Sequence, residues 1–220
     1  MRVPLELPYA IDANSPFVEV LFHRRAVRAY TPEVVAEPRM LALLKAAVAA
    51  PTAKHEEPCQ FVVVQDGRVM KRVSDRAKEL ARAAAAQHGN VLKSPGSPGD
   101  GIASPLADPE YNVFYDAGTL VVICAKLEPP PHTSDFWPSH SFVVADCWLA
   151  AENLMLAACA DGLGTCCIGF AVPALNDAMI KSELGIPPDL EAIAPVIVGI
   201  PSGITPAVPR KPPDVLRWIR

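Results

Sequence analysis

Three arginines lie within five residues in the segment HRRAVRAY, residues 23–30. Arg24, Arg25 and Arg28 present planar, multidentate N–H donors that match the oxygens of a phosphate. By composition alone, a solvated basic helix end is the favoured interpretation of such a cluster. A second pair of cations, Arg210 and Lys211, stands in the segment PRKP. The two clusters can hold one phosphate only if the fold brings them together.

The six cysteines do not form a metal-binding pattern, because there is no C-x-x-C pair and no His at a zinc-ligand offset. We interpret those inside apolar segments, such as Cys124 and Cys147, as small buried hydrophobes. Cys166 and Cys167 are adjacent, and vicinal cysteines bridge only through a strained ring. Packing is therefore the favoured role for them and a redox couple the alternative. No metal site is predicted.

The elements that would position these residues are strands that come singly between helices. Ser15 and Pro16 are typical of a helix start, and the arginines fall at or just beyond the end of that helix. Further helices are predicted over 39–50, 68–87 (an exposed one), 141–160 and 173–184, and strands over 59–67, 119–125, 165–169 and 194–200. Gly162 and Gly164 are predicted to close the helix 141–160 as αL caps. This order predicts a three-layer α+β or α/β domain with a central sheet, spanning residues 1–220.

Two irregular stretches, 90–110 and 126–140, are rich in Pro, and loops of this length often line a binding site. No strand is followed by G-x-G-x-x-G or a P-loop. A nucleotide-like cofactor would therefore need side-chain cations for its phosphate. No Ser/His/Asp set or acid–base dyad is evident. The proline-rich tail that ends at Arg220 is expected to run over a surface, such as that of a partner subunit.

Composition excludes several classes of protein. The 220 residues carry a net charge of −4, which argues against a nucleic-acid binder. The start of the chain lacks the apolar stretch of a signal peptide. The most apolar segment, 142–160, is interrupted by Asp146, Glu152 and Asn153, so no membrane span is expected. A cytoplasmic protein is the default expectation.

Several segments in collinear order resemble the nitroreductase family of FMN enzymes. They begin with HRRAVRAYTPEVV and APTAKHEEPCQFVVV, the second of which is similar to the family's Ala-Pro-Ser-x-x-Asn-x-Gln-Pro-Trp-x-Phe segment. They continue with YDAGTLVVICAK, ADCWLAAENLMLAACADGLGTCCIG, LGIPPDLEAIAPVIVGIP and PRKPPDVL. The resemblance spans residues 15–216. It implies a mostly antiparallel sheet flanked by helices, in a homodimer with a C-terminal extension.

The resemblance also implies which residues bind FMN. Arg24 and Arg28 match positions at the phosphate and the pyrimidine edge of the flavin, and Arg25 and Ala26 are neighbouring contacts. Arg210 matches a late phosphate-binding arginine of the family. The loop that meets the ribityl chain, often across the dimer interface, matches Pro51, Thr52, Ala53 and His55. A polar residue near the pyrimidine ring matches Asn112. The segment whose backbone N–H faces flavin N5 matches Cys167, Ile168 and Gly169.

This sequence departs from the family pattern at four positions in or near these motifs. His55, Glu57 and Cys59 stand where Asn, Gln and Trp are usual, and Val208 stands where some members have a second cation. His can replace Asn as a hydrogen-bond donor. Glu57 brings a negative charge to a loop expected near an anion, which is unfavourable unless it pairs with an arginine.

The implied activity is the FMN-dependent transfer of hydride from NAD(P)H to nitroaromatics, quinones or similar electron-poor small molecules, in a ping-pong reaction through flavin N5. Flavin, rather than a catalytic side chain, carries the chemistry. Two alternatives remain open at this point. One is a family member with another reaction, such as flavin fragmentation or reductive dehalogenation. The other is a non-catalytic flavin carrier or redox sensor that uses Cys166 and Cys167.

Overall fold

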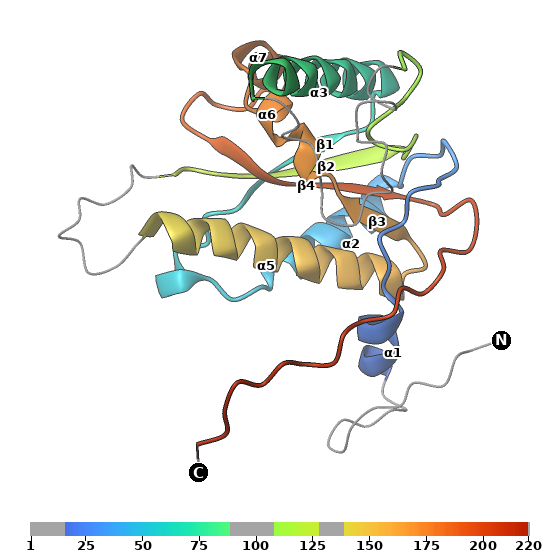
Figure 1. Cartoon of the computed structure of the whole chain (residues 1–220), viewed down its shortest axis with the longest axis vertical. Helices are drawn as coiled ribbons and strands as arrows, with labels where there is room; N and C mark the ends of the chain where they lie inside the picture. Colours follow the sequence, from blue (N-terminus) through green and yellow to red (C-terminus); the bar gives the residue numbers. More distant parts are fainter. Residues whose placement is uncertain (1–15, 89–107, 128–138, 220) are drawn as a thin grey trace.

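The computed structural model describes residues 16–88, 108–127 and 139–219 (Figure 1). The N-terminal segment and most of the two predicted loops, 90–110 and 126–140, lie outside these residues. In the described part, the sheet and its helices determine where the arginine clusters and the segment around Cys166 lie.

The centre of the chain is a four-stranded sheet in the order β1-β2-β4-β3. Its strands are β1 (Gln60–Val64), β2 (Thr119–Ala125), β3 (Gly164–Cys167) and β4 (Glu191–Gly199). Every neighbouring pair is antiparallel, with Val62 opposite Val122 and Cys166 opposite Ile197. Every residue of β2 is buried, as a continuous run of β-branched and apolar residues predicts. The predicted antiparallel sheet is thus confirmed.

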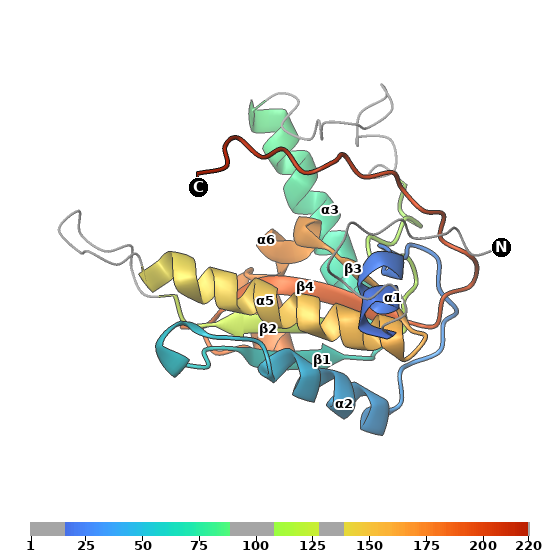
Figure 2. The ribbon, with the colours of Figure 1, turned by 90° about the horizontal axis from the view of Figure 1, so that it is seen from below.

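Helices cover both faces of the sheet and give three layers (Figures 1 and 2). On one face lie α2 (Glu37–Val48) and α5 (Ser139–Ala160), which pack against each other. On the other lie α3 (Gly67–His88), α6 (Val172–Leu175) and α7 (Ala178–Leu184). The short helix α1 (Pro16–His23) packs against α5. Two 3-10 turns, η1 (Ala53–His55) and η2 (Gly169–Ala171), complete the described elements.

The core has two parts, one on each face of the sheet. Successive residues of β2 point to opposite faces, so Leu120 and Val122 join the α3 side, whereas Val121 and Ile123 join the α5 side. All four are fully buried. A central strand of this kind has no polar face, because helices cover both sides of it.

Helix α5 is apolar on nearly all sides and lies against the sheet. It buries Ala151 and Leu154 but leaves Trp148 and Leu149 38% and 44% exposed. By length and composition alone Phe142–Ala160 could cross a membrane, with a mean hydropathy of 1.5. The core helix of a soluble domain passes the same test, and the packing of α5 on α2 and three strands is that of a core helix.

Two predicted helices differ from the structure. The helix α3 is not fully exposed, because Met70 and Val73 pack into the core and Lys78 is buried beside them. The segment 173–184 is not one helix but two, α6 and α7. Asp177 stands between them with extended backbone and caps α7 by accepting a hydrogen bond from the Met179 N–H at 3.0 Å.

The segment after α1 runs beside the edge strand β3. The Val27 N–H donates to the Thr165 carbonyl at 2.9 Å, and Ala26 forms a parallel bridge with Thr165. This close approach requires glycine at 164, because a Cβ there would lie 2.9 Å from the Val27 side chain. Gly164 therefore serves packing rather than the predicted helix cap, which is Gly162 with a φ of 72°.

Candidate functional site

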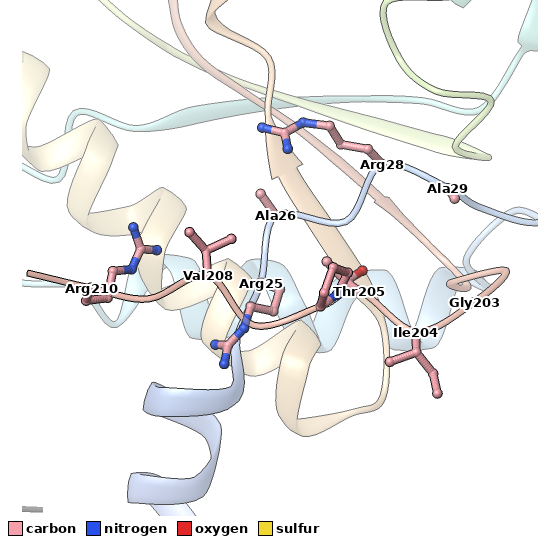
Figure 3. Close-up of a pocket in the computed structure, with 10 residues that line it drawn as sticks. Arg25, Ala26, Arg28, Ala29, Gly203, Ile204, Thr205, Val208 and Arg210 are labelled. Atoms are coloured by element: carbon pink, nitrogen blue, oxygen red, sulfur yellow. The ribbon is translucent and has the colours of Figure 1, made fainter. Parts of the chain in front are cut away.

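The two cationic clusters of the sequence line one groove of about 510 Å³ (Figure 3). Arg25, Ala26 and Arg28 form one side, and Arg210 and Val208 belong to the other. Between them the chain runs through residues 203–206, a few residues after β4. The groove thus joins segments almost two hundred residues apart, and no Asp or Glu of the described residues lines it.

The three arginines of the groove have different partners. Arg25 folds back on the end of α1 and donates to the carbonyls of Phe22 and Arg24 at 2.7 and 2.8 Å. Arg28 points toward the end of β3 in Figure 3, where its positive charge acts on the Cys166 thiol. Arg210 is exposed. None of the three is held by a carboxylate among the described residues, so their charges face an open groove.

Arg24 lies apart from this groove. Its Nε forms an ion pair with Glu152 of α5 at 3.2 Å, and it lines a smaller adjacent hollow of about 230 Å³ with Cys159. The sequence places Arg24 and Arg25 side by side, but a step of one residue at a helix end turns their side chains to different surfaces.

The segment Cys167–Gly169 adjoins the groove through Arg28 and Cys166. Burial raises the pKa of the Cys166 thiol, and the positive charge of Arg28 opposes that rise. The Ile168 N–H donates to the Pro195 carbonyl at 3.0 Å and is therefore engaged in the sheet. Gly169 is exposed and begins η2, where an N–H group has no partner within the helical turn. Gly169 is thus the better placed backbone donor of this segment.

A turn at 108–117 lies on the other side of Arg28. Burial raises the pKa of Tyr111 to about 12, and the charge of Arg28 acts against this rise. The Tyr111 and Tyr115 rings meet edge to face at 6.3 Å. The amide of Asn112 is engaged within the turn, since it donates to Asp116 at 2.9 Å and accepts from the Phe114 N–H at 3.0 Å. Asn112 therefore shapes the turn.

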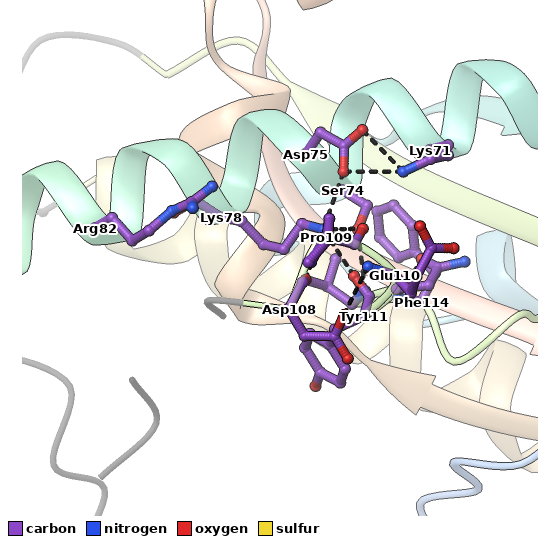
Figure 4. Close-up of polar contacts among 12 residues, drawn as sticks. Lys71, Ser74, Asp75, Lys78, Arg82, Asp108, Pro109, Glu110, Tyr111 and Phe114 are labelled. Atoms are coloured by element: carbon purple, nitrogen blue, oxygen red, sulfur yellow. Dashed lines mark hydrogen bonds and ion pairs between the residues drawn. The ribbon is translucent and has the colours of Figure 1, made fainter. Parts of the chain in front are cut away.

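The buried Lys78 of α3 fixes this turn (Figure 4). Its ammonium group donates to the carbonyls of Pro109 and Tyr111 at 3.0 and 2.9 Å, and more weakly to that of Asp108 at 3.4 Å. It also lies 3.0 Å from a carboxylate oxygen of Asp75. The side chain is only 3% exposed, so these partners satisfy a charge that water cannot reach.

The predicted flavin loop lies elsewhere within one chain. The Ala53 N–H donates to both carboxylate oxygens of Asp146, in the N-terminal half of α5, at 3.2 Å. The arginines instead follow α1, which contacts the other end of α5 in Figure 2. The arginine groove is lined by none of the four residues predicted in this loop, Pro51, Thr52, Ala53 and His55.

The loop 53–57 has an unusual backbone. Lys54, His55 and Glu57 have φ angles of 55°, 57° and 45°, in the left-handed region that residues with a Cβ rarely adopt. Each such residue costs on the order of 1–3 kcal/mol, and strain of this kind clusters at binding sites. The Glu57 side chain is exposed and has no arginine partner among the described residues.

Several residues around the groove were not predicted from the sequence. Gly203, Ile204 and Thr205 line it, and Tyr111 lies beside Arg28. The only sequence signal for the first three is their place between the last strand and the PRKP motif. Tyr111 directly precedes Asn112, but nothing in the sequence indicates which of the two side chains points toward Arg28.

The family model described as the nitroreductase family matches residues 21–200. The chain belongs to the nitroreductase family. It is 26% identical over 184 residues to a candidate NADH dehydrogenase/NAD(P)H nitroreductase of Archaeoglobus fulgidus, with 84% of each chain covered. A similar protein of Methanothermobacter thermautotrophicus is 25% identical, covering 84% of this chain and 77% of that protein.

Solved structures of the family share the fold. A nitroreductase with bound FMN from Bacteroides fragilis has a TM-score of 0.69 and 22% identity, covering 94% of this chain and 99% of its own. Another with bound FMN, from Desulfitobacterium hafniense, has a TM-score of 0.67 and 17% identity, covering 89% and 95%. These likenesses confirm the family fold that the motifs predict.

Proposed function

We propose that this member of the family is an FMN-dependent NAD(P)H oxidoreductase that reduces nitroaromatics, quinones or similar electron-poor small molecules. The observation that carries the proposal is the groove lined by Arg25, Arg28 and Arg210, which no carboxylate of the described residues lines. Three cations that no described carboxylate neutralises, with the exposed Gly169 nearby, suit a ligand that has an anionic end and a polar ring edge.

The groove fits FMN in size and in chemistry. Its volume of about 510 Å³ lies within the ~300–1,000 Å³ of most cofactor sites. Arg25 and Arg210 would hold the phosphate, since both line the groove and guanidinium groups bind phosphate in a bidentate manner. Arg28 would face the pyrimidine edge, because it reaches the end of β3. FMN supplies the hydride chemistry when bound; the side chains bind it and orient it.

Three groups of this chain would place a substrate against the flavin. Gly169 offers a backbone N–H at the end of β3, and its missing side chain leaves open space there. The Tyr111–Tyr115 pair gives an apolar wall beside Arg28, and Lys78 holds that wall in place. Positioning of this kind, with water as the source of protons, is what hydride transfer requires of a protein.

We propose further that the site is completed in a homodimer. The strained loop 53–57 and the arginine groove are separated within one chain, so the loop can contact the same cofactor only from a second copy. The exposed apolar residues Trp148 and Leu149 of α5 give a dimer an apolar surface to bury. A cytoplasmic location is consistent with this proposal.

A visible absorption spectrum tests the first proposal. The purified protein, or the protein titrated with FMN, should show flavin bands that bleach when NADH or NADPH is added without air. An acceptor screen should then restore the bands. Arg28→Met should raise the Kd for FMN about tenfold, whereas Arg68→Met, whose side chain is 87% exposed at the start of α3, should leave it unchanged. A protein that takes up no FMN would contradict the proposal.

Mixing two variants tests the shared site. If each site combines the groove of one subunit with the loop of the other, Arg28→Met and His55→Ala homodimers are both impaired. Random re-assortment then restores about one quarter of the sites, because one site of each mixed dimer has both wild-type parts. Mixed protein no more active than the two parents would show that the loop serves its own chain's groove.

The redox-sensor alternative receives no support from the positions of its sulfurs. The Cys166 Sγ faces the Cys167 carbonyl at 3.6 Å, and the Cys167 Sγ faces the Met155 Sδ at 3.5 Å. The two thiols therefore point to different neighbours. The same anaerobic bleaching experiment separates a reductase from a passive flavin carrier, since a carrier would leave the flavin oxidised.

A further inference from the structure

A different pair of cysteines has its sulfur atoms in contact. Cys59, which directly precedes β1, and Cys147, in the N-terminal half of α5, lie with their Sγ atoms 3.8 Å apart, within the distance of a thiol hydrogen bond. They are 88 residues apart in the sequence. Among the six cysteines, all of which the structure describes, no other two thiols form such a contact.

We propose that Cys59 and Cys147 form a redox-active dithiol, which low-molecular-weight disulfides oxidise to an intramolecular disulfide. The inference goes beyond the proposed function and does not rest on it. Closing the bond requires the two sulfurs to approach by about 1.8 Å, from 3.8 Å to the ~2.05 Å of a disulfide. Cys59 lies outside β1, after a loop that is not tied into the sheet, so that end of the pair can move.

The two thiols divide the reaction between them. Cys59 is half-buried and can meet a small disulfide, whereas Cys147 is completely buried and can meet only Cys59. The hydrogen bond between the two thiols lowers the pKa of Cys59, against the effects of partial burial and of Asp146. The same hydrogen bond, together with burial, raises the pKa of Cys147. Cys59 is therefore the attacking thiol and Cys147 the resolving one.

The exchange balances in two steps. The Cys59 thiolate attacks one sulfur of the small disulfide, which forms a mixed disulfide and releases one small thiol. Cys147 then loses its proton, and its sulfur attacks the Sγ of Cys59 and displaces the second small thiol. The protein loses two protons and two electrons in total, and the small disulfide gains them as two thiols.

The bond would tie the strained loop to α5. Asp146, the neighbour of Cys147, already accepts a hydrogen bond from Ala53, so the covalent and polar links would hold the two ends of the segment 53–59 on one helix. The cross-link also closes a long loop of the unfolded chain, and a long closed loop is the condition under which a disulfide stabilises most. The oxidised protein should therefore unfold at a higher temperature than the reduced protein.

Peptide mapping of the full chain tests the proposal. Fully reduced protein is equilibrated with oxidised and reduced glutathione, the exchange is stopped with acid, and free thiols are then blocked with N-ethylmaleimide in guanidinium chloride, which also exposes the buried thiols. Chymotrypsin cuts after Phe142 and Trp148 and so separates Cys147 from the three cysteines that follow it; trypsin cuts after Lys54. We expect the peptides HEEPCQF and VVADCW to be joined, and two of the six thiols to escape blocking. Dithiothreitol should release them.

Two variants serve as a matched pair. Cys59→Ser should abolish the link and leave Cys147 fully blocked, whereas Cys159→Ser, at another half-buried cysteine of α5, should retain it. Glutathione found stably on Cys59, a link between Cys166 and Cys167, or six blocked thiols under oxidising conditions would each overturn the proposal. These three results are read in the wild-type protein, so the test holds even if a variant fails to fold.

Discussion

Replacing Lys78 by Met gives a direct test of how the structure holds the turn beside Arg28. Met has nearly the length of Lys but no donor, so Lys78→Met removes the ammonium group without opening a large cavity. Three backbone carbonyls lose their donor: those of Asp108, Pro109 and Tyr111. The ion pair with Asp75 is lost as well, although Asp75 keeps its second partner, Lys71, at 3.1 Å.

The size of the effect follows from these partners. A hydrogen bond to a charged donor contributes about 1.5–3 kcal/mol, and a buried carbonyl left without a donor costs about 1–3 kcal/mol. Asp108 and Pro109 are exposed residues, so water can replace the donor at their carbonyls, whereas Tyr111 is half-buried. The methionine of Lys78→Met has no charge to bury, and the desolvation free energy saved in this way offsets part of the lost stability. We expect a net loss of about 3 kcal/mol in the free energy of unfolding.

Urea denaturation measures this loss, and Lys71→Met is the matched control. Lys71 stands on the same helix two turns earlier and also pairs with Asp75, but its side chain is 60% exposed, so its removal should cost only about 0.3–0.5 kcal/mol. Lys78→Met should also weaken FMN binding, since the Tyr111–Tyr115 wall loses its anchor. Equal losses of stability in the two variants would refute the idea that Lys78 fixes the turn.

Three further predictions follow from single contacts. Gly164→Ala should lower the free energy of unfolding by about 1–3 kcal/mol, because its Cβ would overlap the Val27 side chain; an unchanged midpoint in thermal unfolding would contradict this. Arg210→Met should raise the Kd for FMN about tenfold in a titration followed by absorbance, without lowering the thermal midpoint, since the side chain is exposed. The Arg76 guanidinium, at 2.7 Å, lowers the pKa of Asp177, so the stability from this pair is present above the unfolded pKa of about 3.9 and lost as the pH falls through the folded value. Asp177→Asn should therefore make the fall of stability below about pH 4 shallower, and identical pH profiles would argue against the pair.

The sequence determined the local elements well wherever one physical signal dominated. The continuous apolar run 119–125 is β2 with the predicted bounds, because a strand covered on both faces has no polar side to break the run. Pro16 and the basic residues after Phe22 marked the two ends of α1, since proline suits the first turn of a helix and cations suit its C-terminal end. The collinear motifs determined the family and its antiparallel sheet.

Contacts between distant residues were decided only by the tertiary structure. Residues 68–87 have the composition of an exposed helix, yet the 108–117 turn covers Lys78 and converts a surface cation into a buried anchor. A single strong break, Asp177, separated α6 from α7, although both halves favour a helix. Burial depends on what packs against a helix, and no local pattern contains that information.

The arginines show the same division at the candidate site. Composition and order identified the two clusters, and the motifs made them a predicted phosphate site. The path of the chain beside β3 and after β4 decided which arginines share a groove. Three of them line it, Arg25, Arg28 and Arg210, whereas Arg24 pairs with Glu152. Dissolved salt screens the interaction between two exposed charges beyond about 10 Å. Cations therefore bind one phosphate together only when folding brings them within that distance. The sequence determined where the cations stand along the chain, and the fold placed three of them along one groove.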